Sequence, residues 1–170
     1  MRFVISGEMS RNRLLQVIVA AYSFYVALLW ITNAALYFEK MGLTRASVVD
    51  YYLGNEQQFT EPRSFAGMLE ISHFHLFAMG MLLLVLTHLV LFTPISNRAK
   101  AWLIVAPFAA ALLDEGSGWL VRFVSPVFAL AKIAGFLALQ TSLAVLVGLA
   151  LWSTFRGTSS AYRSGEDGGD

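Results

Sequence analysis

Four long runs of apolar residues dominate the sequence, and they constrain the fold more than any other feature. The runs cover residues 14–38, 64–92, 101–124 and 127–155, and each has the roughly 20 residues that a helix needs to cross the hydrocarbon core of a bilayer. A chain inside a bilayer must satisfy its backbone hydrogen bonds internally, and continuous apolar runs of this length indicate helices. We therefore expect an all-α integral membrane protein in which residues 1–156 form one bundle of four transmembrane helices.

The composition agrees with a membrane protein and excludes several classes of function. Hydrophobic residues make up 57% of the 170-residue chain and charged residues 14%, against about 25% charged residues in soluble proteins. The formal net charge of +1 gives no concentrated basic face for nucleic acid. The chain has no cysteine, which excludes thiolate metal sites, iron–sulfur clusters and covalently attached c-type haem. The expected partners are the lipid bilayer and either other membrane subunits or further copies of the chain, as a homo-oligomer.

The only long hydrophilic connection, residues 39–62, carries local signals for a short helix. Thr44 followed by RASVVDYYLG predicts an N-capped helix that ends at Gly54. Its apolar residues suit the membrane surface, so we expect a short amphipathic helix in this first outer loop. Ser64 is a suitable N-cap for the second span.

The charges outside the spans predict the orientation. Seven of the 12 Lys and Arg residues lie in the N-terminal arm, in the hairpin 93–100 and in the tail after the fourth span. The positive-inside rule places these segments, and therefore both termini, in the cytoplasm, as in a bacterial inner membrane or an equivalent membrane. The tail 157–170 holds too few apolar residues to offset the entropy of ordering, so we expect it to be disordered.

The second span carries an unusual number of ionisable residues for a membrane helix, namely Glu70, His73, His75 and His88. A charged group at the centre of a bilayer costs about 2.5 to 3.5 kcal/mol or more, so these side chains should face protein, water or a cofactor. At about 3.6 residues per turn, Glu70, His73 and His88 fall within about 60° of one another, whereas His75 points to the opposite side of the helix.

Three further ionisable residues share the depth of this group. Asp114 and Glu115 interrupt the third span, and Lys132 lies near the start of the fourth. At about 1.5 Å per residue, they lie in the same layer of the outer half as Glu70 and the first two histidines. An unpaired buried ammonium tends to lose its charge, so we expect Lys132 to pair with an acid of the second or third span. The sequence DEGSG leaves open whether the third helix continues or breaks there.

The fourth span has small residues at intervals of four, three and four positions. Small residues let two membrane helices approach closely, so this face should pack inward or mediate dimerisation. The residues of the pattern are Ala131, Gly135, Ala138 and Ser142.

The ionisable layer favours acid–base chemistry. His73 shares a helix face with Glu70 and a depth with Asp114 and Glu115, so we expect His73 to be the functional residue, with the carboxylates and Lys132 completing its site. Such a site suits a small membrane subunit that handles protons or electrons, with a quinone as the bound molecule.

Two cofactor alternatives remain open. His75 and His88 lie 13 residues apart, a spacing that resembles that of b-type cytochromes, where one helix ligates two stacked haems; the resemblance implies that both histidines bind a cofactor. That arrangement takes four histidines on two helices and this chain has three on one, which leaves a single haem b. Glu70 and His73 reproduce the Glu-x-x-His spacing of di-metal bundles, which would make them ligands of a transition metal. The rival class is a non-enzymatic scaffold or assembly subunit whose charged residues only lock the helices together.

Overall fold

The computed structural model describes residues 13–166 of the chain, with side chains for residues 13–155. Five α-helices and two short 3₁₀ helices follow one another. In chain order these are α1 (Arg13–Lys40), α2 (Arg45–Leu53), η2 (Glu56–Gln58), α3 (Phe65–Val90), α4 (Asn97–Phe123), η3 (Pro126–Phe128) and α5 (Ala129–Glu166).

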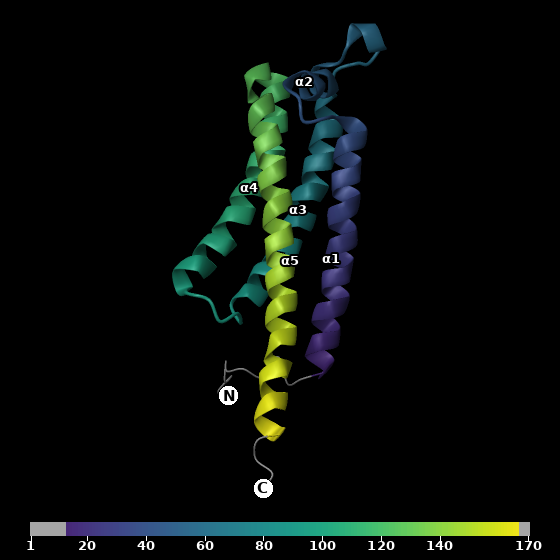
Figure 1. Ribbon diagram of the computed structural model, residues 1–170. Coiled ribbons are helices and arrows are strands. Elements are labelled where there is room, and N and C mark those ends of the chain that lie inside the picture. The colour runs from purple at the N-terminus through teal and green to yellow at the C-terminus, as the bar shows by residue number, and fades with distance from the viewer. Residues whose placement is uncertain (1–12, 167–170) are drawn as a thin grey trace.

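Four segments are long and apolar enough to cross a membrane: α1, α3, α4 and the stretch Pro126–Phe155, which consists of η3 and the first part of α5. α2 lies across one end of the bundle, between the ends of the long helices (Figure 1). The predicted fold class, an all-α bundle of four membrane helices with a short helix in the first outer loop, is therefore confirmed. Which end faces the cytoplasm remains a prediction, and we refer to the end that carries α2 as the α2 end.

Helix α5 forms the centre of the bundle. α1, α3 and α4 all pack against α5, and α3 also packs against α4. α1 meets α3 through a hydrogen bond that the Tyr22 hydroxyl donates to the Leu82 backbone oxygen, at 3.1 Å. α2 contacts α4 and α5 at the α2 end. α1 and α3 lie side by side, with α2 above their ends in this view (Figure 1).

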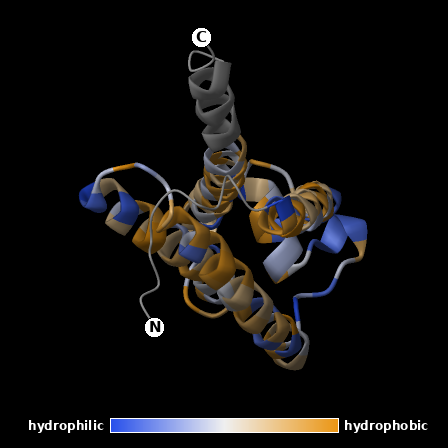
Figure 2. Cartoon of the chain, turned by 90° about the horizontal axis from the view of Figure 1, so that it is seen from below, coloured by the Kyte–Doolittle hydropathy of each residue, from blue (hydrophilic) through white to orange (hydrophobic). Residues whose placement is uncertain are grey.

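The buried side chains form two clusters along the bundle. One lies around Val26, Leu83 and Leu143, and the other, at the α2 end, lies around Val48, Val121 and a stacked pair of rings, Tyr37 and Phe136, whose centroids are 3.7 Å apart. The long helices are mostly apolar along their length (Figure 2), and many of their large apolar side chains are exposed. Because lipid tails are as apolar as leucine, close packing and polar contacts hold such helices together rather than exclusion of water.

Two glycines let elements touch at the α2 end. A Cβ added to Gly135 of α5 would lie 2.6 Å from the Asp114 backbone nitrogen of α4, and one added to Gly118 would lie 2.5 Å from the Tyr52 hydroxyl of α2. Gly135 is buried, so this member of the small-residue pattern packs inward as expected, while Ala138 of the same pattern is exposed. The pattern therefore marks one tight helix crossing rather than a continuous small face.

The helix boundaries follow the predicted caps. The Thr44 hydroxyl accepts a hydrogen bond from the Ser47 N–H, the Ser64 hydroxyl accepts one from the Gly67 N–H, and Gly54 ends α2 with φ of 80°. Left-handed backbone of this kind is accessible to glycine at little cost.

Three further expectations concern chain continuity and the termini. α4 runs without a break through the sequence DEGSG, so the continuous form of the third helix is the correct alternative. The predicted disorder of residues 157–170 differs from the structure over 157–166, where α5 continues. Residues 167–170 and the N-terminal arm before residue 13 lie outside the described residues.

Candidate functional site: an acid–base layer within the bundle

Lys132 and Asp114 form a buried ion pair between α5 and α4. The Lys132 Nζ lies 2.7 Å from Asp114 Oδ1 and donates a hydrogen bond to the Asp114 backbone oxygen at 3.1 Å. Lys132 is only 7% exposed. It lies three residues before Gly135, the glycine that approaches the Asp114 backbone closely. The prediction that Lys132 pairs with an acid of the second or third span is confirmed, with Asp114 as the partner.

Glu115, the next residue of α4, is bound to α3 instead. Its Oε1 accepts a hydrogen bond from the Ser72 hydroxyl at 2.5 Å, and its Oε2 lies 3.2 Å from His75 Nδ1. Trp119 Nε1 donates to Ser72 Oγ at 2.8 Å, so the Ser72 hydroxyl accepts from the indole while it donates to the carboxylate. These contacts orient Glu115 and leave the His75 side chain half exposed at the edge of the network.

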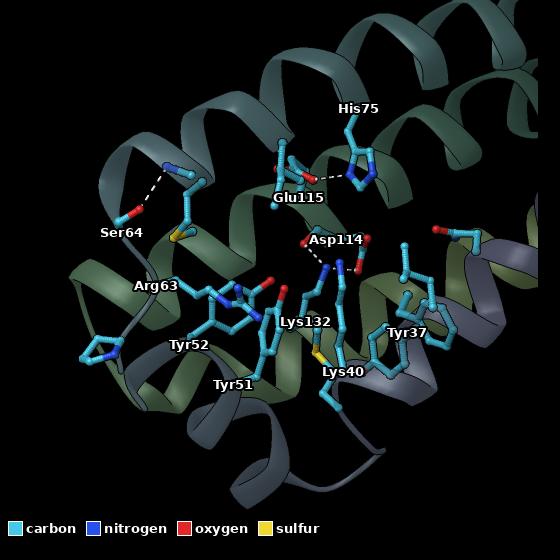
Figure 3. A pocket seen from close by; sticks show the side chains of 18 of the residues that line it. Tyr37, Lys40, Tyr51, Tyr52, Arg63, Ser64, His75, Asp114, Glu115 and Lys132 are labelled. Carbon is cyan, nitrogen blue, oxygen red and sulfur yellow. Dashed lines mark hydrogen bonds and ion pairs between the residues drawn. The ribbon is translucent and has the colours of Figure 1, made fainter. Parts of the chain in front are cut away.

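We call His75, Asp114, Glu115 and Lys132 the acid–base layer. Figure 3 shows the four side chains converging between α3, α4 and α5, with Lys40 of α1 extending beside Lys132. Adjacent positions on α4 thus contact different helices, because successive residues of a helix point about 100° apart. Asp114 faces α5 and Glu115 faces α3, so the layer ties three helices together.

The structure does not bring Glu70 and His73 to this layer. Both side chains are exposed on the side of α3 that faces away from α4 and α5, and His88 is exposed as well. The expectation that His73 faces Asp114 and Glu115 is therefore wrong, although His73 and His75 do point in opposite directions as the helical geometry required. The reason is that α3 has apolar residues on every side. Its composition therefore does not distinguish the face that packs on the bundle from the face that meets lipid.

Sequence reasoning missed Ser72 and Trp119, which hold Glu115. No sequence signal singled them out, because the residues of α3 that face the bundle recur at intervals of three or four positions, and so do the residues of its exposed face. The inner stripe, which faces the bundle, consists of Met68, Ser72, His75, Met79, Leu83, Leu86 and Val90.

A cleft of about 390 Å³ opens above the acid–base layer, between α1, α2 and α3. Tyr51, Tyr52, Lys40 and Arg63 line its walls on the side towards α2 (Figure 3), and the Arg63 guanidinium lies 4.1 Å from the centroid of the Tyr51 ring. Burial, and next the negative charge of Asp114, raise the pKa of Tyr52 on α2, so its hydroxyl stays protonated at neutral pH. The cleft therefore presents both hydrogen-bond donors and acceptors.

A second, apolar cavity of about 150 Å³ lies on the side of the acid–base layer that is further from the α2 end. It shares Asn33, His75, Asp114 and Glu115 with the cleft, so the acid–base layer and Asn33 lie between the two spaces. Among its walls is Trp30, whose indole nitrogen is buried and has no hydrogen-bond partner among the described residues. A buried N–H without an acceptor costs about 1 to 3 kcal/mol, which favours a ligand with an acceptor atom in this cavity. The remaining walls include Leu29, Met79, Leu82, Leu83, Phe108, Leu139 and Leu143.

The geometry gives less support to the metal and haem alternatives. Within the described residues, no group of three or more His, Asp or Glu side chains is placed to hold a metal ion, and Glu70 and His73 lie on the outer face of α3. His75 contacts α4 whereas His88 is exposed near the other end of α3, so the two histidines do not face a common site.

The comparisons with known proteins agree with the fold and assign no activity. No curated protein and no solved structure matches the chain. Residues 42–161 match the family Aq_1264_TM, described as a transmembrane helical domain. The matched range includes α2, α3, α4 and the acid–base layer, and it covers more than half of the 170 residues. The chain therefore belongs to the Aq_1264_TM family of transmembrane helical domains.

Proposed function

We propose that this chain is a membrane subunit whose acid–base layer exchanges protons with a lipophilic quinone. The observation that carries the proposal is the position of the His75–Glu115 pair, with a polar cleft on one side and an apolar cavity on the other. A quinone has a planar apolar ring and two carbonyl acceptors, and small-molecule sites in general combine apolar walls with a few placed polar groups.

The cleft between α1 and α3 supplies a route for such a ligand. Both helices are long and apolar enough to cross a membrane, and both line the cleft and the apolar cavity on the α2-end side of the Tyr22–Leu82 hydrogen bond, so a lipophilic molecule could enter directly from the bilayer. The ring would occupy the apolar cavity, with one carbonyl accepting from the unpartnered Trp30 indole. The other carbonyl would then lie towards His75 at the layer.

Proton transfer is assigned to His75 and Glu115. Imidazole is the side chain whose ordinary pKa lies nearest neutral pH, and His75 is half exposed and adjoins both cavities. Glu115 is fixed by Ser72 and can exchange a proton with the imidazole through the 3.2 Å contact, so it can return a proton to His75 after the imidazole has given one to the reduced quinone. Reduction of a quinone to its quinol consumes two electrons and two protons; the layer supplies protons, and we assign the electrons to a partner redox subunit.

A scaffold function is the second candidate, and the Lys132–Asp114 pair favours it. This pair joins α4 to α5 beside the tight contact at Gly135, and intramembrane pairs of this kind can serve helix assembly alone. A scaffold needs the Lys132–Asp114 ion pair but does not need His75. A measurement of quinone binding therefore distinguishes the two candidate functions.

Binding of decylubiquinone to the detergent-purified protein tests the proposal, with quenching of tryptophan fluorescence as the readout. We expect saturable quenching, and we expect His75→Gln to weaken binding by about tenfold, the effect of losing one hydrogen bond of about 1.4 kcal/mol. The matched control is His73→Gln, two residues away on the outer face of the same helix, which should bind as the unmodified protein does. Absence of saturable binding, or equal loss in both variants, would favour the scaffold.

A further inference from the structure

The outer face of α3 carries a second regular stripe that the bundle does not use. Its residues follow one another at intervals of four, three, four, three and four positions, and all are exposed; Phe74 and Phe77 are 71% and 73% exposed. This stripe lies on the side of α3 away from the inner stripe that packs on α4 and α5. The outer stripe consists of Glu70, Phe74, Phe77, Met81, Leu84 and His88.

Lipid alone is a poor partner for this stripe. Glu70 makes no ion pair or hydrogen bond with the rest of the described chain, and His73 flanks the stripe about one turn further along. The two residues lie about 8 to 12 Å along α3 from its first residue, at the α2 end, where an ionisable group facing hydrocarbon is costly. We therefore expect the partner of the outer stripe to be polar at the depth of Glu70 and His73. Further from the α2 end, where the stripe is apolar, we expect an apolar partner.

The charges point to a second copy of the chain. The alternating intervals of four and three residues place the outer stripe on one face of α3, which a parallel partner helix can cover along its length. A twofold axis along the membrane normal would set two copies of α3 parallel and at equal depth, with the same stripe on both. Each carboxylate at position 70 would then have an imidazole from position 73 of the other copy within reach.

We propose that two copies of this chain associate through the outer stripe of α3, with Glu70 of each copy paired to His73 of the partner subunit. Phe77 and Met81 lie near the middle of the seam, where a thioether and an aromatic ring pack favourably. The inner stripe of the same helix remains with α4 and the acid–base layer, so the association is independent of the proposed quinone site.

Disulfide trapping tests the interface, because the chain has no native cysteine. We expect Phe77→Cys, and separately Met81→Cys, to form a covalent dimer when native membranes are oxidised with copper phenanthroline. The control is Leu28→Cys on α1, at the same distance of 12 residues from the α2 end of its helix and also exposed, which should stay monomeric. Far-ultraviolet circular dichroism of each purified variant verifies that the helices are intact.

The polar pair has its own readout. Glu70→Gln combined with His73→Gln should lower the trapped fraction of Phe77→Cys at least severalfold, whereas Glu56→Gln in the loop should leave it unchanged. Trapping that is equal at Leu28 and Phe77, or that is absent at both Phe77 and Met81, would overturn the proposal. A product that contains a different protein would also overturn it, because the occupant would then not be a second copy.

Discussion

Gly135 of α5 lies directly against Asp114 of α4, so closely that an added Cβ would be 2.8 Å from the Asp114 Cα. Three residues earlier in α5, the Lys132 ammonium reaches the Asp114 carboxylate at 2.7 Å. The close backbone approach and the ion pair thus occur at the same crossing. The geometry of the acid–base layer depends on this crossing, because Glu115 follows Asp114 on the same helix.

Gly135→Ala should therefore destabilise the protein. The added methyl group meets backbone rather than a flexible side chain, and overpacking of this kind costs about 1 to 3 kcal/mol. Gly148→Ala on the same helix is the control, since nothing lies within 4 Å of its Cβ position and alanine favours helix over glycine by up to about 1 kcal/mol. Thermal unfolding in detergent should show a lower Tm for the first variant and an unchanged or higher one for the second.

Lys132→Met should destabilise the bundle by removing the partner of a buried carboxylate. Loss of one member of a buried pair costs about 3 to 5 kcal/mol. Combining Lys132→Met with Asp114→Asn should recover part of this loss, whereas combining it with Glu70→Gln should give an additive result. The measurement is a double-mutant cycle from unfolding in sodium dodecyl sulfate mixed micelles. Strict additivity with Asp114→Asn would show that the ion pair contributes no coupling.

The alkaline limit of stability should depend on Tyr52. Its folded-state pKa is raised by burial and next by Asp114, so the unfolded chain loses this proton first. The resulting contribution to stability is complete below about pH 10, the ordinary tyrosine value, and is lost as pH rises above it. Tyr52→Phe should flatten the decline of Tm above pH 10 relative to the unmodified protein, and Tyr25→Phe, exposed on α1, should not.

The orientation is testable by labelling, again because the chain lacks cysteine. We predict that both termini lie in the cytoplasm. A cysteine at Gln57, beside α2, should react with a membrane-impermeant maleimide in intact cells, and one at Ser159 should react only after the cells are lysed. The reverse pattern would place the α2 end in the cytoplasm.

The fold could be predicted from the sequence because each span is a long and mainly apolar run, and the caps at Thr44 and Ser64 are local signals. Pairing of Lys132 followed from the cost of a lone buried charge. The choice of Asp114 as its partner did not follow, because it depends on how α4 and α5 cross at Gly135.

The functional face of α3 could not be predicted for a different reason. In a soluble helix the polar side marks the solvent, but here His73 and His75 both lie among apolar residues, and lipid and protein interior favour the same side chains. Helical geometry placed them on opposite faces correctly. Only the packing of Ser72 and His75 against Glu115 identifies the inner face. The cleft was likewise outside the reach of the sequence, since it depends on the separation of α1 and α3.

The most direct test of the central claim is an infrared difference spectrum of the purified protein with decylubiquinone, recorded between its oxidised and electrochemically reduced forms. If the acid–base layer exchanges protons with the quinone, a carboxyl stretching band should change on reduction, disappear in Glu115→Gln and persist in Glu70→Gln. A spectrum without a carboxyl band, or a band that survives in Glu115→Gln, would contradict the account.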